Sequence, residues 1–132
     1  MNFTLGTCFK NTNPPPPPQH YWFVLSNPTA ENCVYIANIT GWDDFYGDGS
    51  CRLSGGEHTC ITKDSYVNYS DSKIVQLSDL EGVLKSGMLS IQEKACDGLL
   101  QLMQQGALES EFCKNRFKKL LAAQNLPRVT PD

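Results

Sequence analysis

The clearest pattern of apolar and polar positions lies between residues 20 and 40, where two apolar segments flank a polar turn. Segment 20–26 (HYWFVLS) is rich in the aromatic and β-branched residues that favour a pleated, half-buried strand. Segment 27–32 (NPTAEN) has turn chemistry, and segment 33–40 (CVYIANIT) is a second strand. We therefore predict an antiparallel hairpin whose open ends bring His20 and Thr40 together.

Shorter apolar segments around this hairpin predict further strands. They lie at 3–10, 50–53, 59–62 and 73–77, separated by glycine- and proline-rich turns and by one helical turn at 62–67. Several short strands at close spacing predict a small antiparallel barrel over residues 1–77. The run of five prolines within 11–19 predicts a stiff, extended loop. It either crosses an end of the barrel or docks into an aromatic groove of a partner.

Helical periodicity replaces the strand pattern after residue 77. Two capping boxes, Ser78-x-x-Glu81 and Ser90-x-x-Glu93, predict helices that end at Gly87 and Gly106. A third apolar stripe predicts a helix over 109–123. The fold class expected is α+β, one compact domain in which C-terminal helices (78–132) pack on or beside the barrel (1–77).

Composition narrows the class of protein. The chain has 132 residues, of which 40% are hydrophobic and 19% charged, as in globular domains. No apolar run approaches the roughly 20 residues of a membrane span, and the N-terminus lacks a signal-peptide pattern. We therefore expect a cytoplasmic protein without membrane contact. The net charge of −3 lies in residues 1–75, and the rest is neutral, so the chain lacks the overall basic footprint of nucleic-acid binders.

The six cysteines are best interpreted as buried thiols in a reducing compartment. Cys51-x6-His58-x-Cys60 brings soft ligands within ten residues, but zinc usually needs a fourth ligand at tight spacing. The aspartates of segment 41–49 do not match the spacing of a calcium loop. We therefore predict no metal and no cofactor.

Two histidines and several hydroxyl groups are the remaining candidates for chemistry. In RNA cleavage one imidazole can remove the 2′-hydroxyl proton while another protonates the leaving 5′-oxygen. His20, Thr40 and His58 are the predicted catalytic residues, with Thr40 as a donor to the charged phosphorane. The predicted substrate-binding residues are Trp22, Asn38, Ser65, Tyr66 and Tyr69. The alternative is that His58 caps a turn and His20 simply begins a strand.

The order of a strand, a long loop, HYWFVLS and CVYIANIT resembles the PemK/MazF-like family of toxin ribonucleases over about residues 3–77. GGEH (55–58) and DSYVNY (64–69) look like a divergent branch of that group. The resemblance implies an SH3-like barrel and metal-independent cleavage of single-stranded RNA to a 2′,3′-cyclic phosphate, with an antitoxin protein and a homodimer as partners. Thr40 falls where the family keeps a catalytic threonine. His20 lies near its catalytic arginine and lacks the guanidinium fork.

Two other functions stay open. A non-catalytic SH3-like module could bind a protein partner through its aromatic side chains, which are common interface anchors. A small-molecule binding domain could use the same cleft.

Overall fold

The computed structural model describes residues 2–11, 20–42 and 48–127, so the five-proline loop and most of the acidic loop lie outside the described part. The described strands are β1 (Cys8–Asn11), β2 (Tyr21–Val24), β3 (Cys33–Gly41), β4 (Arg52–Leu53), β5 (Ser65–Gln76) and β6 (Leu89–Gln92). The described helices are α1 (Leu77–Lys85), α2 (Asp97–Glu109), α3 (Asn115–Ala123) and the short 3₁₀ helix η1 (Gly49–Cys51).

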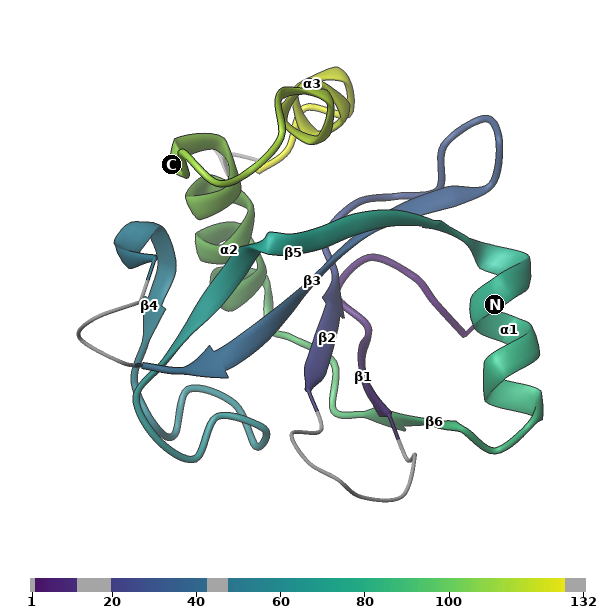
Figure 1. Cartoon of the computed structure of the whole chain (residues 1–132), viewed down its shortest axis with the longest axis horizontal. Coiled ribbons are helices and arrows are strands. Elements are labelled where there is room, and N and C mark those ends of the chain that lie inside the picture. The colour runs from purple at the N-terminus through teal and green to yellow at the C-terminus, as the bar shows by residue number, and fades with distance from the viewer. Residues whose placement is uncertain (1, 12–19, 43–47, 128–132) are drawn as a thin grey trace.

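The predicted hairpin is confirmed and forms the centre of the sheet. β2 and β3 pair antiparallel with Tyr21 opposite Ile39 and Val24 opposite Ile36. The six strands form one antiparallel sheet in the order β4-β5-β3-β2-β1-β6 (Figure 1). The α+β class is therefore confirmed, but the predicted closed barrel is wrong, because β4 and β6 are the two edges of the sheet and do not pair with each other.

Alternating side chains of the central strands bury two separate cores, one on each face of the sheet. Phe23 and Tyr35 face the larger core, which α2 and α3 cover with Leu99, Met103 and Phe117. On the opposite face Val24, Val34 and Ile36 form a smaller core with Phe3, Phe9, Leu80 of α1 and Leu89 of β6. Figure 1 shows α2 and α3 grouped together, with α1 at the far end of the sheet.

Three predictions of local structure are wrong for tertiary reasons. Residues 65–67 are not a helical turn but the start of β5, which pairs with both β3 and β4. The Ser90-x-x-Glu93 box does not start a helix, because Leu89–Gln92 pairs with the edge of β1. The third helix starts at Asn115 rather than near 109, since the Ser110 hydroxyl donates to Asp48 and accepts from the Phe112 N–H in a turn.

Other sequence predictions hold in part. Residues 59–62 form no strand, whereas the helix predicted before Gly87 is present as α1. The C-terminal segment contributes β6 to the sheet as well as helices to its face. It therefore belongs to the same sheet as the strands before it. In the part of the chain that the structure describes, no helix has the length and apolar character needed to cross a bilayer.

Candidate functional site

A pocket lies at the open end of the β2–β3 hairpin, where the sequence predicted that His20 and Thr40 meet. The register of the hairpin continues from the Tyr21–Ile39 pair to place His20 beside Thr40. The pocket has a volume of about 250 Å³. We call it the hairpin pocket; it is lined by His20, Tyr21, Ile39, Thr40, Gly41, Cys60, Thr62, Lys63 and Ser65.

Thr40 lines this pocket and has an unpaired hydroxyl group. Its Oγ1 atom is buried and has no hydrogen-bond partner among the described residues. A buried hydroxyl without a partner costs free energy, and such groups are uncommon in folded proteins. The hydrogen-bonding capacity of the Thr40 hydroxyl is therefore not used by any of the described residues.

Lys63 is a pocket residue that sequence reasoning missed. Its side chain crosses Gly41 so closely that a Cβ atom there would lie 2.9 Å from Lys63 Cε and 3.0 Å from Nζ. Ser65 donates its hydroxyl to the Lys63 carbonyl at 2.9 Å, which fixes the backbone beneath the lysine. No spacing in the sequence links residue 63 to residue 41, so this ammonium group could not have been assigned from the sequence.

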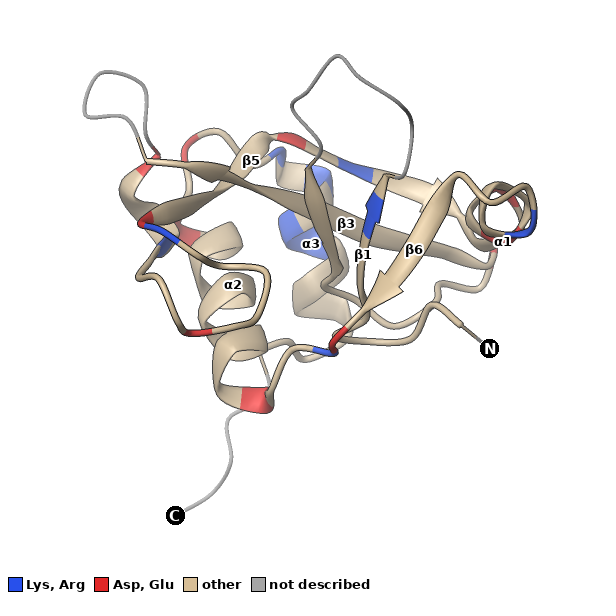
Figure 2. Cartoon of the chain, turned by 90° about the horizontal axis from the view of Figure 1, so that it is seen from below, with Lys and Arg blue, Asp and Glu red and all other residues tan. Residues whose placement is uncertain are grey.

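A second lysine flanks the hairpin pocket. Lys10 of β1 lies opposite Tyr21 in the sheet, and its Nζ lies 5.7 Å from the centre of the Tyr21 ring. Figure 2 shows Lys and Arg positions interspersed with Asp and Glu positions along the described strands, helices and loops. The positive charge relevant to an anionic ligand is local: Lys10 and Lys63 beside the pocket.

His58 does not line the hairpin pocket. It lies in a separate, open depression of about 520 Å³ with Glu57, Thr59, Ile61 and Glu93, and Thr62 is common to both linings. The expectation that both imidazoles share one hollow is therefore wrong, because the loop after β4 turns His58 towards Phe23 in the core. The two ring centroids lie 5.3 Å apart in an edge contact.

Both ring nitrogens of His58 already have backbone partners. Nε2 lies 2.7 Å from the Glu93 carbonyl, and Nδ1 lies 3.0 Å from the Cys60 amide nitrogen. A carbonyl only accepts and an amide N–H only donates, so Nε2 carries the proton and Nδ1 carries the lone pair. The side chain is 6% exposed. The two hydrogen bonds hold the loop after β4 to the segment after β6. This agrees with the alternative of the sequence analysis, in which His58 caps a turn and is not catalytic.

Of the predicted substrate-binding residues, only Ser65 lines the hairpin pocket. Asn38 is 1% exposed and lies within β3, with its Oδ1 atom lacking a partner among the described residues. Tyr66 is buried with its ring against Trp42, 5.8 Å between centroids. Tyr69 is 1% exposed and donates its hydroxyl to the Met103 carbonyl. Trp22 is half-buried beneath the Lys73 ammonium, 5.0 Å from the ring centre.

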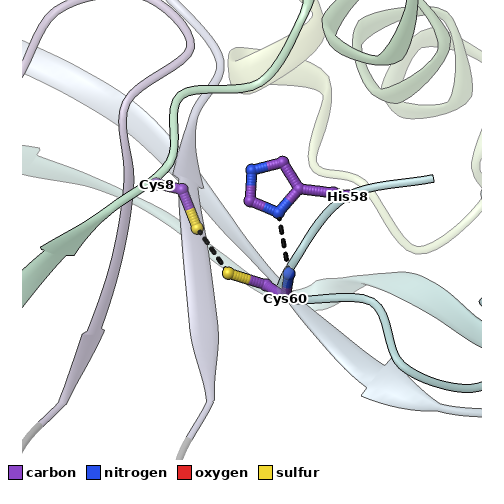
Figure 3. Close-up of side chains that lie close together, drawn as sticks. All are labelled: Cys8, His58 and Cys60. Atoms are coloured by element: carbon purple, nitrogen blue, oxygen red, sulfur yellow. Dashed lines mark hydrogen bonds between the residues drawn. The ribbon is translucent and has the colours of Figure 1, made fainter. Parts of the chain in front are cut away.

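The structure also brings Cys8 of β1 to the His58–Cys60 pair (Figure 3). The Cys8 and Cys60 sulfur atoms lie 3.6 Å apart, and all three residues are buried. Burial raises the pKa of both thiols above the ordinary value, and the nearby Glu93 charge adds to this for each. Cys51, the cysteine considered in the sequence pattern, instead packs in the larger core beside Gly106.

Comparison with known proteins gives no relative for this chain. No protein-family model, no curated protein and no solved structure matches it.

Proposed function

We propose that the protein is an endoribonuclease of the PemK/MazF-like toxin type, which cleaves single-stranded RNA at the hairpin pocket without a metal in the reaction. The observation that carries the proposal is that His20, Thr40 and Lys63 line one pocket, and that the Thr40 hydroxyl has no partner among the described residues. The family resemblance implies a catalytic role for Thr40 and places His20 near the catalytic arginine of the family. Lys63 supplies a cation next to the place where the resemblance expects an arginine.

His20 is the proposed general base. A neutral imidazole would take the proton from the ribose 2′-hydroxyl, and the resulting alkoxide would attack the adjacent phosphorus. The bond from phosphorus to the 5′-oxygen breaks as the new bond forms. The products are a 2′,3′-cyclic phosphate on one fragment and a 5′-hydroxyl on the other.

Lys63 and Thr40 are the proposed partners of the phosphate. Negative charge grows on the non-bridging oxygens in the transition state, so donors aimed at them lower the barrier. Thr40 has a free hydroxyl, and Lys63 has an ammonium group at the pocket wall. Lys63 is also the acid available in this pocket to protonate the leaving 5′-oxygen. Ser65 has committed its proton to the Lys63 carbonyl, so its role is to position Lys63.

The proposal also includes the other features that the family resemblance implies. They are an SH3-like ancestry for the open sheet, action in the cytoplasm, an antitoxin protein as inhibitor and a second copy of the chain as partner. The alternative of a non-catalytic binding module lacks comparable support, because Tyr66 and Tyr69, two of its aromatic anchors, are buried.

The test is digestion of a pool of short single-stranded RNAs that together contain every trinucleotide, in the presence of a chelator. We expect fragments with 2′,3′-cyclic phosphate ends. Thr40→Val, which keeps the shape and removes the hydroxyl, should reduce the rate about 10²- to 10³-fold. Thr40→Ser should retain most of the cleavage rate. Lys63→Met should also lower the rate, whereas the matched control Lys119→Met on α3 should not. A folded wild-type protein that cleaves none of these RNAs would overturn the proposal in favour of a binding module.

A further inference from the structure

We propose that Cys8, His58 and Cys60 form a structural zinc site that ties the loop after β4 to β1. Cys8 lies 52 residues before Cys60 in the chain, yet the fold brings it to the neighbouring pair His58 and Cys60 at the larger core. Their ligand atoms all lie within 4.8 Å of one another. The site is separate from the proposed cleavage reaction, and no step of that reaction passes through it.

The sulfur geometry matches that of a zinc site. Two zinc–sulfur bonds of about 2.3 Å at a tetrahedral angle place the sulfur atoms about 3.8 Å apart. Cys8 Sγ and Cys60 Sγ lie 3.6 Å apart, and Figure 3 shows the two side chains directed at each other with the imidazole beside them. Both cysteines are free thiols. The pair is therefore already close to the spacing that a bound ion requires.

His58 is prepared for metal binding by its partner on the other ring nitrogen. Zinc-binding histidines usually donate their second N–H to a carbonyl or carboxylate, which fixes the tautomer and the ring. Nε2 makes that bond to the Glu93 carbonyl at 2.7 Å, which leaves the lone pair on Nδ1. Nδ1 now accepts from the Cys60 N–H, and a bound ion would take the place of that proton donor.

The ligand set selects zinc among the common ions. Two thiolates and one imidazole suit zinc, whereas calcium and magnesium require oxygen ligands. The three side chains would supply three of the four ligands of tetrahedral zinc, and Glu93, an exposed residue that lines the depression beside His58, or a water would complete the set. Cys8 is 0%, His58 6% and Cys60 8% exposed, so the three protein ligands are shielded from bulk water.

A zinc ion here would also support the hairpin pocket. The loop that carries His58 and Cys60 continues directly into Thr62 and Lys63, and Cys60 itself lines the pocket. The residues between β4 and β5 contain no helix or strand, and most of their backbone hydrogen bonds stay within the loop, as from the Gly56 N–H to the Ile61 carbonyl and from the Ile61 N–H to the His58 carbonyl. Crosslinking Cys60 to β1 through a metal would fix the approach of Lys63 to Gly41.

The direct test is metal binding by the full chain, purified with a chelator and a reductant that does not bind metals. We expect native mass spectrometry to show one Zn²⁺ per chain. The Co²⁺-loaded protein should show thiolate charge-transfer bands and the visible bands of tetrahedral cobalt. The thermal unfolding midpoint of the metal-free protein should rise when Zn²⁺ is added and fall again when a chelator removes the ion. Wild-type protein that binds neither ion at one equivalent would overturn the proposal.

Variants identify the ligands. Cys8→Ser and Cys60→Ser should each weaken Zn²⁺ binding at least about 100-fold, since even outer-shell partners of zinc ligands contribute about 10- to 100-fold. Cys51→Ser, a buried thiol outside the cluster, and the exposed Cys96→Ser are the matched controls and should bind as the wild type does. Binding that survives the loss of both Cys8 and Cys60 would overturn the assignment.

A measurement on the wild type covers the case in which a variant fails to fold. X-ray absorption of the zinc-loaded protein should show two sulfur ligands at about 2.3 Å and lighter ligands at about 2.0–2.1 Å. A shell of oxygen and nitrogen ligands alone would show that the ion lies elsewhere. RNA cleavage is measured on both the zinc-loaded and the metal-free protein, so failure of the zinc site and failure of the proposed nuclease are distinguishable.

Discussion

The two histidines occupy opposite kinds of environment. His20 lines an open pocket beside a hydroxyl group that has no partner in the described structure. His58 is buried, and backbone groups occupy both of its ring nitrogens. The same residue type thus lines an open pocket at one site and holds a loop in place at the other.

The contrast extends to the other polar groups of the two regions. In the interior beneath α2, Tyr69 donates to the Met103 carbonyl and Tyr35 donates to Ser72. At the hairpin pocket, Thr40 Oγ1 has no such partner among the described residues. Paired polar groups stabilise one fold, whereas unpaired ones at a pocket are available to a ligand. Burial and pairing, rather than residue type, therefore separate structural from candidate catalytic residues.

The largest expected effect is on cleavage, at His20. His20→Gln should lower the rate about 10²- to 10⁴-fold, which is the usual contribution of a general base, and leave the free energy of unfolding unchanged within about 0.5 kcal/mol. RNA cleavage assays and urea denaturation measure the two quantities. Unchanged cleavage with His20→Gln would break the comparison, because His20 would then be an ordinary strand end.

His58 should show the converse. His58→Ala leaves the Glu93 carbonyl and the Cys60 N–H without partners and removes the contact with Phe23, so the metal-free protein should lose about 3 kcal/mol of stability. His20→Ala is the control. Equal unfolding midpoints for the two alanine variants in urea would contradict the structural role of His58.

Glycine substitutions compare the packing of the two regions. A Cβ at Gly106 of α2 would overlap the Tyr69 hydroxyl and lie 2.6 Å from Cys51 Cβ, so Gly106→Ala should cost about 3 kcal/mol. A Cβ at Gly41 meets only the far end of the Lys63 side chain, which can move. Gly41→Ala should therefore cost less than about 0.5 kcal/mol, as measured by thermal and urea unfolding, and displace Lys63.

Alkaline pH should weaken the interior through Cys51. Burial raises the pKa of this thiol from 9.0 to about 11. The unfolded chain releases the proton first, so this contribution to stability is complete below pH 9 and is lost as the pH rises towards 11. The size of this contribution is at most about 3 kcal/mol. Cys51→Ala should flatten that part of the stability–pH curve, and the exposed Cys96→Ala should leave it unchanged.

The smallest expected effect concerns the unpaired hydroxyl itself. Thr40→Val should leave the protein as stable as the wild type or more stable by less than about 1 kcal/mol, because no hydrogen bond within the described structure is lost. Ser72→Ala, which breaks a paired hydroxyl in the interior, should cost about 1 kcal/mol. A larger loss with Thr40→Val than with Ser72→Ala would show that Thr40 has a structural partner.

Sequence predictions were right where the two pairing strands are neighbours along the chain. The hairpin of β2 and β3 was predictable because its strands are joined by a short turn, and its register then placed His20 beside Thr40. Segment 89–92 was wrongly predicted as helix because its partner, β1, lies about 80 residues earlier in the chain. Local capping chemistry cannot outweigh a strand edge that offers free backbone groups.

By itself, the sequence determined the mixed α+β class, the central hairpin and the meeting of His20 with Thr40, since these depend on neighbours along the chain. Only the tertiary structure decided that the sheet stays open, that Lys63 reaches Gly41 and that Cys8 joins His58 and Cys60. Contacts between distant segments depend on how both cores pack, and no short-range pattern encodes that packing. The same packing places the His58 ring against Phe23, outside the hairpin pocket, where it holds the loop after β4 in place.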